Sequence, residues 1–79
     1  MADTNRERLI HCFQAVFPDL SESDIPRATT ERVGAWDSIA TVTLTAVIEE
    51  EFGVQVPGEE IETLTSFDAF LRIVDRDSR

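Results

Sequence analysis

The sequence predicts an all-α fold, a bundle of three main helices and one short helix with a long loop between the first two. Three segments carry apolar residues at the spacing of helical turns, and a proline or a glycine ends the first two of them. No two segments show the alternation expected of a pair of β-strands. The chain has 79 residues, and we therefore expect a single domain over residues 1–79.

The first helix is expected over residues 4–17. Leu9, Phe13 and Val16 follow helical spacing and give this segment one apolar face. Pro18 then ends the helix, because the residue before a proline is disfavoured in the helical conformation.

Residues 18–36 show no sustained period and are expected to form the long loop. A loop of this length in a small domain is usually either functional or held down by apolar residues of its own. Four residues are spaced to hold it against the core: Leu20, Ile25, Val33 and Trp36.

The second helix is the clearest prediction, over residues 38–52, with Gly53 where a C-terminal cap belongs. At 100° per residue, Leu44 and Ile48 lie on a stripe that should face the core. A second, smaller apolar stripe lies on the opposite side and is either covered by the long loop or left for a partner. Its members are Ile39, Val42 and Ala46.

The remainder is expected to be an extended link over residues 53–58, a short helix over 59–64, and a last helix capped by Thr65 or Ser66. The apolar face of that last helix consists of Phe67, Phe70, Leu71 and Val74. The core predicted from all helices consists of Leu9, Phe13, Phe17, Leu44, Ile48, Phe52, Phe67, Phe70 and Leu71.

The charge of the chain restricts its partners. The chain has sixteen acidic and seven basic residues, and its formal net charge is −9. This argues against binding to nucleic acid or to an anionic membrane and favours either a partner with a basic surface or simply solubility. No segment approaches the roughly 20 apolar residues of a membrane span, and the polar N-terminus lacks the apolar stretch of a signal peptide. A cytoplasmic location is therefore expected.

Catalytic and metal-binding patterns are missing from the sequence. His11 and Cys12 are the only residues of their kinds, and as neighbours on a helix they point about 100° apart. Cys12 is therefore interpreted as a small core residue. The chain has none of the usual zinc or calcium motifs, and we expect neither a catalytic residue nor a metal site.

Asp37 and Ser38 stand side by side where the second helix begins. Either residue type is a good N-terminal cap. If Asp37 caps the helix, the Ser38 hydroxyl is free, and a phosphate on it would lie at the positive end of the helix dipole. If Ser38 is only a cap, the alternative is that the chain is a small acidic adaptor for a basic protein surface.

The surrounding sequence resembles the acyl carrier protein family over essentially the whole chain. The runs that carry the resemblance are GAWDSI at 34–39, EEEFG at 49–53, GVQVP at 53–57, EEI at 59–61 and LTSF at 64–67. The resemblance implies that Ser38, beside Asp37, is the attachment point of 4′-phosphopantetheine derived from coenzyme A. Acyl or aminoacyl intermediates would then be carried as thioesters on a protein that is not itself an enzyme.

The resemblance also implies the partners. A phosphopantetheinyl transferase would load the arm, and an acyl-loading ligase or transferase and downstream synthase enzymes would act on the cargo. The surface that these enzymes read is expected to consist of Ile39, Val42, Ala46, Glu50 and Ile61.

No segment of the chain belongs to a synthase module, and we therefore expect a stand-alone, monomeric carrier, with an excised domain as the alternative. Three residues favour a specialised carrier, for fatty-acid, polyketide or other biosynthesis, over a housekeeping fatty-acid carrier. Ala40 and Thr43 replace common acidic residues of fatty-acid carriers, and Ala46 replaces a bulky apolar one. Thr45 places a hydroxyl on the core side of the second helix, in place of a usual aliphatic residue. This suggests the hypothesis that the cargo is short or polar.

Overall fold

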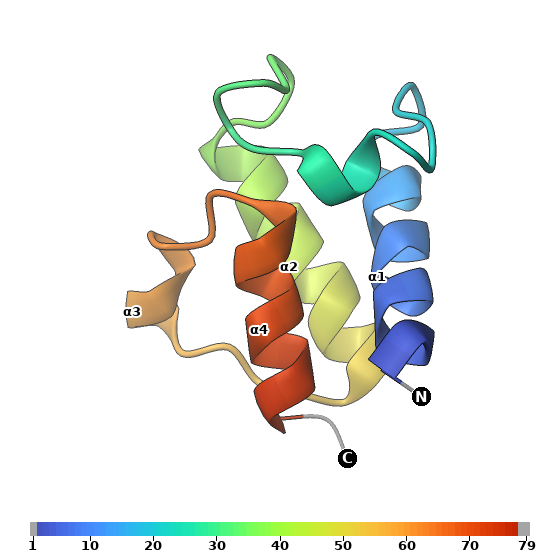
Figure 1. Cartoon of the computed structure of the whole chain (residues 1–79). Helices are drawn as coiled ribbons and strands as arrows, with labels where there is room; N and C mark the ends of the chain where they lie inside the picture. The colour runs from blue at the N-terminus through green and yellow to red at the C-terminus, as the bar shows by residue number, and fades with distance from the viewer. Residues whose placement is uncertain (1, 78–79) are drawn as a thin grey trace.

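A computed structural model describes residues 2–77 of the chain, with the side chains of residues 4–76. Its helices are α1 (Ala2–Val16), α2 (Ser38–Phe52), α3 (Gly58–Ile61) and α4 (Phe67–Asp77), and a 3₁₀ turn, η1 (Ile25–Arg27), lies in the long loop (Figure 1). Within the described residues there is no β-strand, only an isolated bridge between Thr29 and Ser66. The prediction of an all-α fold with three main helices and one short helix is confirmed.

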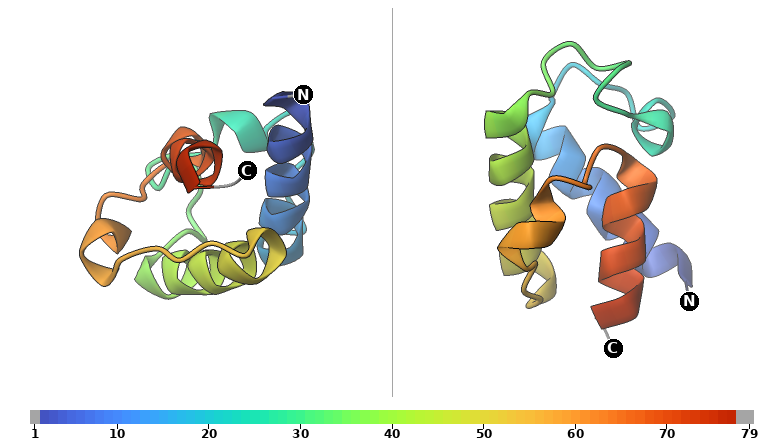
Figure 2. Two further views of the ribbon diagram at one scale, coloured as in Figure 1. Left: turned by 90° about the horizontal axis from the view of Figure 1, so that it is seen from below. Right: turned by 90° about the vertical axis from the view of Figure 1, so that its left-hand side faces the viewer.

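The three main helices surround one core, and α3 stands to the side. Helix α1 packs against both α2 and α4, whereas α3 makes its principal helix contacts with α2. The two turned views in Figure 2 show α3 outside the three-helix arrangement, beside the space between α2 and α4. None of the helices in residues 2–77 is both long and apolar enough to cross a membrane.

The core is built around a cluster of aromatic rings. The Phe13 ring lies at its centre, with centroids 5.5 Å from Trp36, 5.2 Å from Phe67 and 5.7 Å from Phe70. Phe17 completes the cluster, 5.8 Å from Trp36. Because these rings come from α1, the long loop and α4, the cluster joins all three.

Most of the predicted core residues are buried, but the prediction was wrong for Phe52 and Leu71, which are only half-buried. Phe52 lies in the last turn of α2, where the Arg8 guanidinium covers its ring at 4.5 Å. Leu71 lies at the edge of the buried face of α4. The core also includes buried residues that the prediction did not list, among them Ile25, Trp36, Val56, Leu64, Ile73 and Val74.

The long loop is held against the core as predicted. Ile25 and Trp36 are buried, and Leu20 and Val33 pack against the core from partly buried positions. Two backbone bonds join the loop to the start of α4: the Thr30 N–H donates to the Thr65 carbonyl at 2.9 Å, and the Phe67 N–H donates to the Ala28 carbonyl at 3.0 Å. The loop is thus a packed part of the domain.

The ends of the helices differ in detail from the prediction. Helix α1 covers Ala2–Val16 in place of residues 4–17, and α3 covers only Gly58–Ile61 in place of residues 59–64. After α3 the chain continues in tight turns, because buried Leu64 draws it back to the core. Of the two candidate caps for α4, Ser66 fills the role, since its Oγ accepts from the Ala69 N–H at 3.1 Å.

Gly53 ends α2 as predicted. Its φ of 67° is in the left-handed region, and its N–H donates to the Glu49 carbonyl. Glycine has no Cβ and adopts this conformation without the strain that other residues incur.

Candidate functional site

The start of α2 is capped by Asp37. Its backbone is extended, with φ −102° and ψ −172°, and its Oδ1 accepts from the Ala40 N–H at 2.8 Å. Its carbonyl accepts the first helical bond, from the Thr41 N–H at 3.0 Å. Ser38 is consequently the first residue of α2 and does not cap it, so the alternative that made Ser38 the cap was wrong on this point.

The Ser38 side chain is exposed, and its hydroxyl has no hydrogen-bond partner within the part of the chain that the structure describes. The first N–H groups of a helix lack intrahelical acceptors and carry the positive end of the helix dipole. A phosphodiester on the Ser38 oxygen would lie beside these groups, where a negative charge is favoured. The position is thus chemically suited to a phosphate ester.

A buried polar contact fixes the backbone that leads into Ser38. Trp36, only 3% exposed, donates from its indole Nε1 to the Thr41 Oγ1 at 2.8 Å. The Thr41 hydroxyl in turn donates to the Asp37 carbonyl at 3.2 Å. The loop residue two positions before Ser38 is thereby attached to the first turn of α2. The sequence analysis expected Trp36 to hold the long loop against the core but gave no signal of this contact.

A groove of about 350 Å³ opens beside Ser38, between the first two turns of α2 and the segment that follows α3. Val42 and Ile61, both expected to contact partners, lie on its two sides. The full set of lining residues is Thr30, Trp36, Asp37, Ser38, Thr41, Val42, Ile61, Glu62, Leu64 and Thr65.

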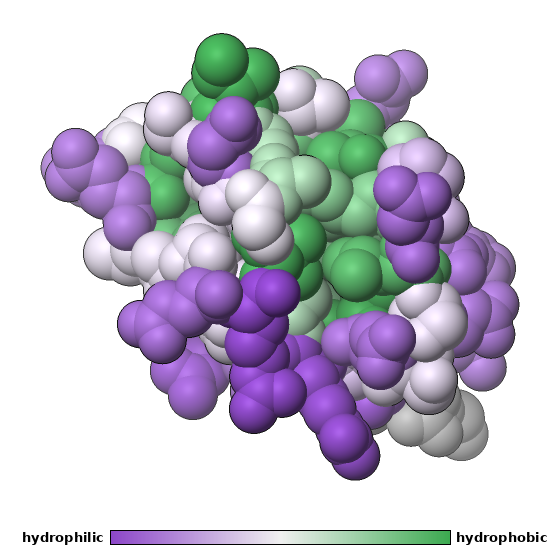
Figure 3. Space-filling view, turned by 90° about the horizontal axis from the view of Figure 1, so that it is seen from above, coloured by the Kyte–Doolittle hydropathy of each residue, from purple (hydrophilic) through white to green (hydrophobic). Residues whose placement is uncertain are grey.

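The second apolar stripe of α2 is open to solvent. Ile39 is 75% exposed and Val42 is 57% exposed, and Ala46 is exposed as well. The alternative that the long loop covers this stripe was therefore wrong. Seen from the end of the molecule where the loop lies, the surface has apolar areas between polar side chains (Figure 3). Of the other residues predicted to meet partners, Glu50 is exposed and Ile61 is half-buried.

The carboxylates of α2 and α3 have different surroundings. Glu49 is half-buried, and its Oε2 accepts from the Val56 N–H at 2.8 Å. Glu51 pairs with Arg8 at 3.0 Å, and Glu60 pairs with Arg76 at 3.3 Å. Glu50 is exposed and has no such partner within the described residues.

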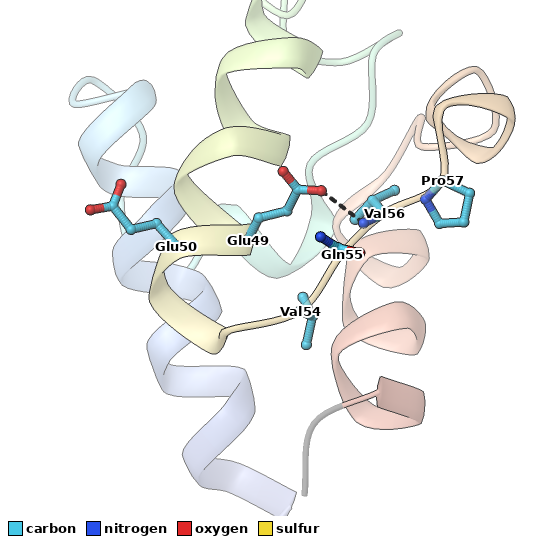
Figure 4. Close-up of a pocket in the computed structure, with 6 residues that line it drawn as sticks. All are labelled: Glu49, Glu50, Val54, Gln55, Val56 and Pro57. Atoms are coloured by element: carbon cyan, nitrogen blue, oxygen red, sulfur yellow. Dashed lines mark hydrogen bonds between the residues drawn. The ribbon is translucent and has the colours of Figure 1, made fainter.

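The link after α2 forms a second hollow, of about 640 Å³, lined by residues 49–50 and 54–57. Figure 4 shows Glu49 turned toward this link and Glu50 turned away from it. The hollow is at the C-terminal end of α2, about 17 Å from Ser38 along the helix axis. It is larger than the groove beside Ser38 but too far away to be part of the same site.

The remaining chemistry-bearing side chains do not form a site. Cys12 is buried, as predicted, and burial, with a smaller contribution from the negative charge of Glu51, raises the pKa of its thiol to about 11. His11 is exposed on the surface of α1. Among the residues that the structure describes, no three His, Cys, Asp or Glu side chains are placed to hold a metal ion.

Comparison with known proteins identifies a family to which this chain is similar. A family model described as the phosphopantetheine attachment site matches residues 7–74. Comparisons with curated proteins and with solved structures gave no match. Because the family model covers most of the chain and the helical fold agrees with it, the chain belongs to the acyl carrier protein family, whose members bear covalently attached 4′-phosphopantetheine.

Proposed function

We propose that this chain is an acyl carrier protein in which the Ser38 oxygen bears 4′-phosphopantetheine. The thiol at the end of this arm would hold acyl or aminoacyl intermediates as thioesters. One observation carries the proposal: Asp37 caps α2, which leaves the Ser38 hydroxyl free at the helix start, within the matched residues 7–74.

The surroundings of Ser38 support a role as a substrate of other enzymes. Loading requires that the serine oxygen lose its proton and form a new bond to a phosphorus of coenzyme A, while the pyrophosphate P–O bond of coenzyme A breaks and adenosine 3′,5′-bisphosphate leaves. The chain has no lysine, and its one histidine, His11, is on α1. The groups that move this proton are therefore assigned to a phosphopantetheinyl transferase, with coenzyme A as the donor of the arm, and the carrier itself is not a catalyst.

The proposed surface for the transferase, the loading enzyme and the synthase enzymes consists of Ile39, Val42, Ala46, Glu50 and Ile61. Exposed apolar side chains on a helix that begins at the attachment residue support this assignment. Glu49 and Glu51 have partners within the chain, whereas the exposed carboxylate of Glu50 is available to a partner protein. Such a charge at the rim of an interface acts mainly on the rate of association with a basic partner.

A specialised pathway is the finer part of this proposal. Thr43 and Ala46 are both exposed on α2. They stand where the resemblance leads us to expect an acidic and a bulky apolar residue in a fatty-acid carrier. A partner that recognises those side chains would find a smaller and less charged surface here, which favours polyketide or other specialised enzymes.

Mass spectrometry of the intact chain tests the proposal. The chain is incubated with coenzyme A and a promiscuous phosphopantetheinyl transferase, and a gain of one phosphopantetheine unit is expected. Ser38→Ala should show no gain, whereas Ser23→Ala, which removes an exposed hydroxyl from the loop, should be loaded normally. Absence of any gain, under conditions that load a known carrier, would favour the acidic adaptor instead.

A further inference from the structure

The groove beside Ser38 is closed on its inner side by a hydrogen-bonded pair. Trp36 and Thr41 both line the groove, yet they are only 3% and 8% exposed, so they also face the interior. The indole Nε1 and the threonine Oγ1 are 2.8 Å apart. Any group that passed from the groove into the core would have to separate these two atoms.

Aromatic rings fill the space behind this pair. The Trp36 ring is stacked on Phe70, with centroids 6.2 Å apart, and makes a near-perpendicular contact with Phe13 at 5.5 Å. Phe17 packs on it at 5.8 Å. Protein interiors are close-packed, so an entering chain would have to displace these rings, and it would leave the buried indole N–H of Trp36 without its acceptor.

Thr45, whose hydroxyl suggested the hypothesis of a short or polar cargo, lies behind the groove. Its hydroxyl donates to the Thr41 carbonyl at 2.8 Å and is buried one turn further along α2. It does not line the groove. Thr41, one turn earlier on α2, is the threonine of this pair that lines the groove.

We propose that Trp36 and Thr41 form a stop at the floor of the groove, which keeps the cargo outside the helical core. The inference rests on the proposed carrier function and deepens it. With the core closed, an alkyl chain gains only the partial cover of Val42, Ile61 and Leu64 at the groove wall. The carrier is therefore suited to acyl groups that are short or polar, and a long alkyl chain stays in contact with solvent.

The test is a series of thioesters of increasing length. Acetyl-, butyryl-, octanoyl- and dodecanoyl-coenzyme A are used with the transferase to load the chain, and thermal unfolding is measured for each product. A chain taken into the core would raise Tm by up to about 3–6 °C for each methylene removed from water. We expect the Tm of the wild-type series to stay within about 2 °C of the acetyl form. A steady rise with length overturns the proposal.

A double variant tests whether the pair itself is the stop. Trp36→Leu with Thr41→Val removes both polar atoms and part of the ring volume, and the Tm of this variant should rise by several degrees from the acetyl to the octanoyl form. Thr43→Val is the matched control, because it removes a threonine hydroxyl from the same helix at an exposed position away from the groove. Its Tm series should stay flat.

The outcomes separate this inference from the proposed function. A chain that gains no mass with any donor contradicts the carrier function itself. A chain that loads fully on Ser38 but gains Tm with acyl length overturns only the stop. A folded double variant whose Tm does not depend on length overturns the assignment of the stop to Trp36 and Thr41. If the double variant does not fold, the wild-type series decides the proposal.

Discussion

The division of roles between Asp37 and Ser38 predicts that two neighbouring alanine substitutions have opposite consequences. Asp37→Ala removes the Oδ1 that accepts from the Ala40 N–H at 2.8 Å. Ser38→Ala removes a hydroxyl that has no hydrogen-bond partner in residues 2–77. The first substitution should weaken the fold without removing the proposed attachment oxygen. The second should abolish attachment and leave the fold intact.

The magnitude follows from the bonds that are lost. Loss of an aspartate cap costs about 1 kcal/mol of unfolding free energy, within a range of roughly 0.5–2. For a domain of this size, that lowers Tm by about 4–8 °C. Asp37→Asn keeps an acceptor oxygen and loses only the favourable charge at the helix start, for about 0.3–1 kcal/mol. For Ser38→Ala we expect a change of less than about 0.5 kcal/mol, because alanine is also the better helix former.

The assay is urea unfolding of the unmodified chain, followed by the helical circular dichroism signal. The expected order of stability places Ser38→Ala beside the wild type, Asp37→Asn below both, and Asp37→Ala lowest. A loss in Ser38→Ala as large as that in Asp37→Ala would mean that Ser38 supports the helix start. The cap assignment, and the argument that the Ser38 oxygen is free for modification, would then be refuted.

The remaining predictions concern the Cys12 thiol and the carboxylates of α2. Burial raises the pKa of Cys12 to about 11, so the folded unloaded chain should not react with a thiol reagent at pH 8. Loading should create one fast-reacting thiol, at the end of the arm. Fast labelling of the unloaded chain would contradict the assigned burial of Cys12. The same shift favours the protonated thiol in the folded state, so unfolding free energy should fall as pH rises from 9.0 towards about 11, and this fall should be smaller in Cys12→Ala. Glu50→Gln should raise the KM of the transferase several-fold at low salt and by less at high salt, and it should leave Tm unchanged. Glu49→Ala should lower the unfolding free energy by about 1–3 kcal/mol, because the Val56 N–H loses its acceptor. Equal losses of stability in Glu49→Ala and Glu50→Gln would argue against the different roles assigned to them.

Local rules were sufficient for the parts of the fold that depend on short stretches of sequence. The extent of α2 follows from a run without glycine or proline, and its end follows from Gly53, which adopts a φ of 67°. The burial of Leu44 and Ile48 and the exposure of Ile39 and Val42 follow from rotation by 100° per residue. The choice between Asp37 and Ser38 as the cap stayed open, because both residue types are good caps and only the backbone path distinguishes them.

The contacts that the sequence did not predict depend on the path of the backbone between elements or on the packing of helices. Trp36 and Thr41 are five residues apart, and they meet because of the path by which the chain enters α2 at Asp37. Glu49 and Glu50 are indistinguishable by composition, yet the link that follows α2 passes on the side of Glu49 and supplies the Val56 N–H as its partner. The pairing of Arg8 with Glu51 likewise requires α1 and α2 to pack side by side.

The central claim is that the arm is attached to the oxygen of one particular serine among the five in the chain, at positions 21, 23, 38, 66 and 78. The most direct test is tandem mass spectrometry of peptides from the chain after reaction with coenzyme A and the transferase. The account predicts that all phosphopantetheine is found on the peptide that contains Ser38, at Ser38 itself. Modification of any other serine, or an unmodified Ser38 in a chain whose intact mass has increased, would contradict it.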